Sequence, residues 1–132
     1  MTIVVTAAVI ERDGAFLVTR RQKGVHLEGC WEFPGGKCEP GEPHDACLAR
    51  ELREELAVDA IVGSEWLRTT HVYPDRSVEL HFLRAELRGE PIPQQGQEMR
   101  WVPRGELAAL EFPPADAELI RLLGRQGEPQ RG

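Results

Sequence analysis

Runs of apolar and β-branched residues alternate with turn residues along most of the chain and predict a series of β-strands. The strands that we expect from this pattern are residues 2–10, 15–21, 61–73, 77–87 and 99–102, and within residues 32–36 we expect a short strand that runs into a turn. Asp13 and Gly14 form a pair that favours a two-residue turn, so the first two strands should form a hairpin. Residues 22–31 show no such pattern and are interpreted as a loop.

Helical spacing dominates residues 44–57, which contain neither glycine nor proline. Leu48, Leu52 and Leu56 recur every four residues and predict one buried stripe of an amphipathic helix. Shorter helices are expected at residues 103–110, where Pro103 suits the first helical position, and at residues 116–123. This order of strands and helices predicts an α/β fold, a mixed α/β sandwich.

Composition narrows the class of protein. With 132 residues, 41% of them hydrophobic and 29% charged, the chain has the size and balance of one globular domain. We expect that domain to span residues 1–124, and residues 125–132 to form a flexible C-terminal tail. Cys30, Cys38 and Cys47 form no Cys-x-x-Cys pair, which argues against a disulfide framework or a zinc site.

Charge and hydropathy restrict the partners of the chain. A net charge of −6 argues against binding a nucleic acid polymer, because phosphate backbones require a basic face. No apolar run approaches the roughly 20 residues of a membrane helix, and the N-terminus lacks the pattern of a signal peptide. We therefore expect a cytoplasmic protein, a monomer or weak dimer, that has no membrane partner and acts on a small molecule.

The candidate chemistry lies on the predicted central helix. At about 100° per residue, Glu51, Glu54 and Glu55 share one face within an arc of about 100°. Carboxylates held so close repel one another, and a hard cation such as Mg²⁺ removes that repulsion. The alternative is a solvated face, in which Arg50 and Arg53 pair with these glutamates for about 0.2–0.5 kcal/mol per pair.

The residues before this helix favour the metal site over the solvated face. The spacing over residues 36–58 resembles the Nudix box, G-x5-E-x7-R-E-U-x-E-E-x-G-U, in which U is aliphatic. The matching residues are Gly36, Glu42, Arg50, Glu51, Leu52, Glu54, Glu55 and Val58. Ala57 departs from the box, which has glycine in the turn that leaves the helix, so the departure bears on local geometry and not on metal binding.

The resemblance implies a Nudix-type α/β/α sandwich with a mixed β-sheet, and it implies roles for the matching residues. Glu51, Glu54 and Glu55 would be the catalytic residues and would bind Mg²⁺, or Mn²⁺, together with the Gly35 carbonyl. One of these glutamates would also orient or deprotonate the attacking water. Glu42 and Arg50 would brace the loop and helix through a buried ion pair. Many Nudix proteins add a carboxylate before the last strand, where this chain offers Gln95 or Glu98.

Four further runs, at residues 19–21, 31–37, 73–76 and 112–116, are similar to MutT-type triphosphatases. That similarity implies hydrolysis of a (deoxy)nucleoside triphosphate to the monophosphate and pyrophosphate, with 8-oxo-dGTP as the expected substrate in nucleotide-pool sanitation. CTP or a modified cytosine nucleotide is the alternative. The candidate substrate-binding residues are Arg21, His26, Phe33, Lys37, Tyr73, Arg76 and Asp116. For Arg21 and Lys37 the alternative is simple solvation, for Tyr73 packing in the sheet, and for His26 an incidental loop position.

Asp116 bears on the choice of base. Guanine-selective relatives usually carry asparagine here, which both donates and accepts, whereas ionised aspartate only accepts. The alternative is a helix N-cap, for which Asp after Pro-Pro-Ala is well suited. Two other functions also stay open: hydrolysis of ADP-ribose or a dinucleoside polyphosphate, and ligand sensing by an inactive Nudix domain.

Overall fold

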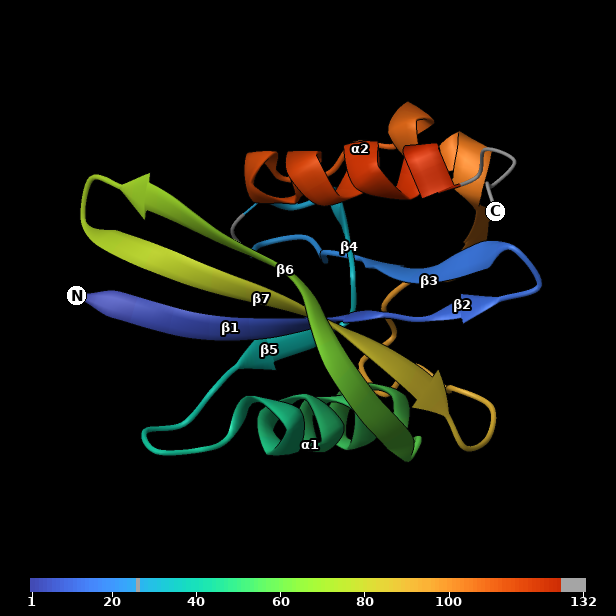
Figure 1. The fold of residues 1–132 in the computed structure, drawn as a ribbon, viewed down its shortest axis with the longest axis horizontal. Helices are drawn as coiled ribbons and strands as arrows, with labels where there is room; N and C mark the ends of the chain where they lie inside the picture. Colours follow the sequence, from blue (N-terminus) through green and yellow to red (C-terminus); the bar gives the residue numbers. More distant parts are fainter. Residues whose placement is uncertain (26, 127–132) are drawn as a thin grey trace.

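The computed structural model describes residues 1–25 and 27–126. The elements, in chain order, are β1 (Thr2–Val9), β2 (Glu11–Arg12), β3 (Ala15–Arg20), β4 (Trp31–Glu32), β5 (Gly35–Lys37), α1 (His44–Leu56), β6 (Ala60–Tyr73), β7 (Arg76–Leu87), β8 (Met99–Pro103), the 3₁₀-helices η1 (Arg104–Ala109) and η2 (Pro114–Asp116), and α2 (Ala117–Gln126). Helix α1 lies on one side of the strands and α2 on the other (Figure 1). This is the predicted sandwich of helices around mixed β-structure.

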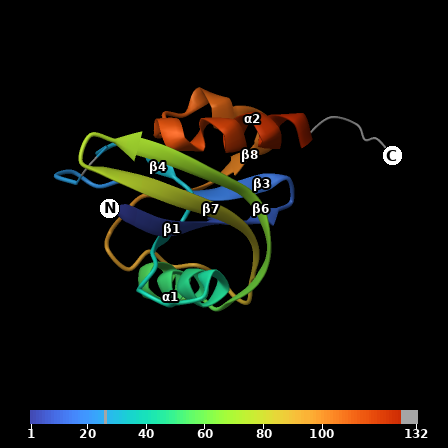
Figure 2. The same ribbon diagram turned by 60° about the vertical axis from the view of Figure 1, so that its left-hand side comes forward.

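In the described residues, the strands form two four-stranded sheets. The first has the order β5-β1-β7-β6, with β1 and β7 parallel and the other pairs antiparallel. The second joins β2, β3, β4 and β8 through antiparallel pairs. Both sheets lie between α1 and α2, as the two views show (Figure 2). The first sheet is therefore mixed, as the sequence predicted.

The predicted hairpin of residues 2–10 with 15–21 was wrong in one respect. Asp13 and Gly14 do form the tight turn, both with positive φ (53° and 79°). However, β3 pairs with the two-residue strand β2, while β1 pairs with β5 and β7 in the other sheet. The chain thus changes sheets near Ile10, a step that strand propensity alone does not reveal.

The short strand predicted within residues 32–36 is two short strands. β4 pairs with β3 in the second sheet, whereas β5 pairs with β1 in the first. Pro34 separates them because it has no N–H to donate, although its carbonyl accepts a hydrogen bond from the Ala8 N–H at 2.7 Å. This crossing places Glu32 and Gly35 at the join between the two sheets.

Alternating side chains of the central strands supply two hydrophobic cores. Ala7 and Val9 of β1 pack with Leu119 and Leu123 of α2 in the first core. Their neighbour Ala8 faces the other way and joins the core that contains Leu48, Leu52 and Leu56 of α1. The leucine stripe of α1 is fully buried, as predicted. It therefore fixes which face of α1 carries the glutamates.

Helix α1 ends one residue earlier than predicted, at Leu56. Ala57 adopts the left-handed conformation (φ 52°) and donates a backbone hydrogen bond to the Arg53 carbonyl at 3.0 Å. Glycine commonly occupies this position because it lacks a Cβ. The turn geometry is therefore kept with alanine, at a cost of roughly 1–2 kcal/mol of conformational strain.

The C-terminal helices differ from the predicted bounds. Pro103 ends β8 and caps the 3₁₀-helix η1 instead of beginning an α-helix. Asp116 ends η2, and α2 runs from Ala117 to Gln126, so positions 125 and 126 are helical and not part of a tail. The remaining predicted tail, residues 127–132, lies outside the described residues. Within the described part of the chain, no helix has the length and apolar character needed to cross a membrane.

Candidate active site

Two glutamates of α1 border a cavity of about 480 Å³. Glu51 and Glu55 are one helical turn apart and line it together with Gly35, Gly36 and Lys37 of β5. Glu54 points elsewhere: its side chain is 58% exposed and does not line this cavity. The helix therefore presents two inward carboxylates and one solvent-facing carboxylate.

Arg50 connects these carboxylates to the preceding loop. Its Nε and Nη2 donate to the two Glu42 oxygens at 2.8 and 2.9 Å, and the pair is mostly buried. Its Nη1 lies 3.0 Å from Glu51 and 3.3 Å from Glu54, and Nη2 also donates to the Lys37 carbonyl. The hydrogen bonds from Arg50 are the main cause that lowers the Glu42 pKa to about 2. The Arg50 guanidinium thus connects the loop before α1, strand β5 and the glutamates of the helix.

The two glycines of β5 allow the strand to approach both α1 and β1 closely. A Cβ at Gly36 would collide with the Glu51 carboxylate, and one at Gly35 would collide with the backbone of Thr6. A side chain at Gly35 would force β5 away from β1, and one at Gly36 would displace the Glu51 carboxylate. The Nudix-box glycine therefore has a steric reason in this structure, namely room for the carboxylate.

Glu55 is the most perturbed of these carboxylates. Burial, then the neighbouring charges of Glu51 and Glu32, raises its pKa to about 8, while a backbone hydrogen bond from Gly35 opposes the rise. Carboxylates crowded in this way favour a cation, and a set of oxygen donors suits a hard ion such as Mg²⁺. The residues present therefore fit a divalent metal site formed by Glu51 and Glu55, with Glu54 at its solvent side.

The raised pKa values make the stability of the metal-free protein depend on pH. The folded state holds protons on Glu55 (pKa about 8) and Asp116 (pKa about 7) that the unfolded chain releases near its ordinary carboxyl pKa values. Stability should therefore fall as pH rises from about 5 to about 9. In the presence of a chelator and at high pH, we expect Glu55→Gln to melt at least about 2 °C above the unsubstituted protein. At low pH the two melting temperatures should differ little. An equal change in melting temperature at both pH values would show that ionising Glu55 does not destabilise the folded protein.

The same cavity contains a second cluster of charges that the sequence did not reveal. Arg21 on the loop after β3 pairs with Glu32 of β4 at 2.7 Å, and both line the cavity with Asp116 of η2. Asp116 is only 5% exposed, and burial followed by the Glu32 charge raises its pKa to about 7. Burial likewise raises the Glu32 pKa, against the effect of Arg21. Glu32 was not among the predicted residues, although a charged residue between Trp31 and Phe33 was a detectable signal.

Four of the remaining predicted substrate residues line the same cavity, namely Phe33, Lys37, Tyr73 and Arg76. Phe33 is largely a core residue, since it is 4% exposed and stacks on Phe112 at 5.4 Å. Tyr73 lies at the end of β6, with its ring 4.5 Å from that of His71. His26 lies outside the described residues.

Of the two candidates for a further metal ligand, Gln95 lies near Glu55 and Glu98 does not line its cavities. Glu98 pairs with Arg20 at 3.1 Å and lines neither this cavity nor the smaller one beside it. That smaller cavity, of about 140 Å³, is lined by Gln95 and Gln97 together with Glu55. The segment before β8 therefore brings amides, and not a carboxylate, close to Glu55.

Comparison with known proteins agrees with this geometry. A family model for the NUDIX domain matches residues 5–122. The 8-oxo-dGTP diphosphatase of Haemophilus influenzae is 38% identical over 123 residues, 92% of this chain and 90% of that protein. The CTP pyrophosphohydrolase of Escherichia coli is 38% identical over 121 residues, 89% of this chain and 88% of that protein.

Solved structures give the same result. The solution structure of the E. coli ORF135 protein superposes with a TM-score of 0.85 at 34% identity, covering 98% of this chain and 95% of that one. A MutT protein from methicillin-resistant Staphylococcus aureus reaches a TM-score of 0.79 at 33% identity, covering 96% and 98%. With the box residues gathered at the β5–α1 junction and these matches spanning most of its length, the chain belongs to the Nudix hydrolase family and is MutT-like.

Proposed function

We propose that this protein hydrolyses a (deoxy)nucleoside triphosphate to the monophosphate and pyrophosphate, with Mg²⁺ as its cation. The observation that carries this proposal is that one cavity combines two kinds of group. Glu51 and Glu55 of α1, together with Lys37, would hold a cation and phosphates. Asp116 and Phe33, which line the same cavity, would contact a base. A triphosphate joined to a base matches this combination.

The chain's own residues have separable tasks in this proposal. Glu51 and Glu55 would hold the cation, which when bound supplies charge neutralisation for the phosphates and an acidified water. Lys37 and Arg76 are exposed at the cavity and would contact phosphate oxygens. Arg50 would keep Glu51 in place through its bond at 3.0 Å. One of the glutamates of α1 would also orient or deprotonate the attacking water.

We infer that the preferred substrate is 8-oxo-dGTP. With its pKa raised to about 7, Asp116 is partly protonated near neutral pH, so it can donate to the O6 of an oxidised guanine as asparagine would. In its ionised form it accepts from the N7–H of that base. A cytosine nucleotide is the second candidate, because ionised Asp116 would also accept from the cytosine amine. The names of the H. influenzae and E. coli relatives support both.

The reaction is tested by hydrolysis in water enriched in oxygen-18. We expect the label in pyrophosphate, which means attack at the β-phosphorus, because the runs that resemble MutT-type triphosphatases imply this cleavage. Mass spectrometry of both products measures this directly. Label in the monophosphate would contradict the attack site. Absence of any pyrophosphate, with tight nucleotide binding retained, would instead support a ligand-sensing domain.

A further inference from the structure

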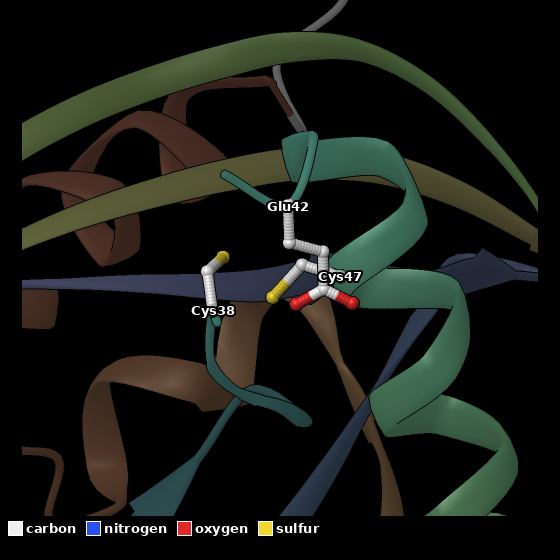
Figure 3. A group of neighbouring side chains, drawn as sticks. All are labelled: Cys38, Glu42 and Cys47. Carbon is white, nitrogen blue, oxygen red and sulfur yellow. The ribbon is translucent and has the colours of Figure 1, made fainter. Parts of the chain in front are cut away.

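Two thiols and a carboxylate meet beside the first turn of α1 (Figure 3). The Sγ atoms of Cys38 and Cys47 and a carboxylate oxygen of Glu42 all lie within 4.8 Å of one another. In Figure 3 the Cys38 and Cys47 side chains point toward each other from the loop after β5 and from α1, with the Glu42 carboxylate beside Cys47. None of the three lines the cavity of the proposed active site.

The backbone holds these three side chains in place. The Cys38 N–H donates to the Val4 carbonyl of β1 at 2.9 Å, which extends the β5–β1 pairing by one residue. The Cys47 N–H donates to the Pro43 carbonyl, also at 2.9 Å, in the first turn of α1. Glu42 lies in the turn between them. The entropic cost of bringing the three groups together is therefore already met by the fold.

The surroundings resemble the outer shell of a metal site. The Cys47 Sγ lies 3.3 Å from the Thr6 hydroxyl and donates to the Gly36 carbonyl at 3.8 Å. Both Glu42 oxygens accept hydrogen bonds from Arg50, which orients the carboxylate. Cys47 is fully buried, while Cys38 and Glu42 are partly exposed, so an ion has a path from solvent. Hydrogen bonds that orient ligands in this way typically accompany protein metal sites.

We propose that Cys38, Cys47 and Glu42 bind a thiophilic divalent cation of the Zn²⁺ class. Two sulfur ligands and one oxygen ligand select such an ion against Mg²⁺, which prefers oxygen. Each thiol releases its proton to solvent on binding, so the two thiolates balance the cation and Arg50 continues to balance Glu42. The fourth position takes water. The ion would fasten the loop after β5 to the start of α1.

The proposed cation site lies outside the active-site cavity and does not depend on the proposed reaction. Cys38 and Cys47 are nine positions apart and match no common zinc motif, so their spacing alone argues against a zinc site. The pair becomes a candidate site only because β5 and α1 pack side by side.

The test is a titration of the reduced, chelator-treated protein with Cd²⁺, which reports thiolate binding through a charge-transfer band in the ultraviolet. We expect saturation at a single ion per chain, unaffected by excess Mg²⁺. Cys38→Ser should weaken Cd²⁺ binding by at least about 100-fold, because even outer-shell changes cost about 10–100-fold. Cys30→Ser, which removes the third cysteine, is the matched control and should bind normally.

Thermal melting gives a second readout. Zn²⁺ should raise the melting temperature of the unsubstituted protein and of Cys30→Ser, because an ion that binds the folded state stabilises it. Zn²⁺ should not raise the melting temperature of Cys38→Ser, which lacks one of the ligands. A Cd²⁺ band that persists in Cys38→Ser, or that Cys30→Ser abolishes as well, would overturn the proposal. The proposal would also be overturned if the reduced protein binds no Cd²⁺ and its mass falls by two hydrogens on mild peroxide treatment. That result would identify Cys38 and Cys47 as a disulfide-forming pair.

Discussion

Changing Glu55 to glutamine is expected to lower kcat for triphosphate hydrolysis by at least about 100-fold, or roughly 2.7 kcal/mol of transition-state stabilisation. Glutamine keeps the shape of the side chain but removes a charged oxygen ligand from the cavity. The attacking water becomes an anion as it loses its proton, and it cannot approach the anionic phosphate without charge neutralisation. The measurement is pyrophosphate release at saturating substrate and Mg²⁺, together with a chelator control that should abolish activity.

The fold should survive this substitution, because the carboxylate is destabilising in the metal-free protein. Glu54→Gln tests the exposed member of the set and should also lose at least about 100-fold if it completes the metal site. Glu106→Gln, an exposed glutamate on η1 away from the cavity, is the matched control and should keep full activity. Near-normal turnover in both Glu54→Gln and Glu55→Gln would contradict the roles proposed for these residues.

The second large effect is expected at Asp116, and it concerns the choice of base. Asp116→Asn replaces a titrating group by a permanent donor and acceptor. A good contact to a base contributes about 1–3 kcal/mol of discrimination, which is roughly 5- to 150-fold in relative kcat/KM. We therefore expect the preference to move toward 8-oxo-dGTP and away from cytosine nucleotides. Asp116→Ala should weaken both preferences and leave the metal site intact.

The pKa of Asp116 adds a test that the substitution alone cannot provide. As pH rises through about 7, Asp116 loses its donor, so the ratio of kcat/KM for 8-oxo-dGTP to that for CTP should fall. Asp116→Asn should remove this pH dependence. If Asp116 only caps a helix, Asn would leave the ratios unchanged and Ala would lower stability by about 1 kcal/mol. Among the described residues, no hydrogen bond from α2 to the Asp116 carboxylate supports the capping role.

Local features of the sequence were enough to predict the helix and the position of its glutamates. The period of Leu48, Leu52 and Leu56 fixes the buried stripe of α1, and at 100° per residue Glu51 and Glu55 must then lie together beside it. The pairing of Glu42 with Arg50 was implied by the resemblance to the Nudix box, and the structure contains it. The leucines and glutamates of α1 are close along the chain, where helix geometry sets the distance between them.

Contacts between distant segments were decided by the tertiary structure. The sheet change near Ile10 and the break at Pro34 depend on how two sheets share the space between α1 and α2, and that packing is not encoded in strand propensity. The outward direction of Glu98 depends in the same way on its pairing with Arg20 across the second sheet.

The sequence by itself determined the family and the helix that carries the candidate glutamates. Only the tertiary structure brought Arg21, Glu32 and Asp116 together in the cavity and Cys38 to Cys47 beside α1. The physical reason is burial: a carboxyl or thiol changes its proton affinity, partners and ligand preference when neighbours from other elements exclude water around it. That enclosure arises from the packing of whole layers, so it has no counterpart in any short stretch of sequence.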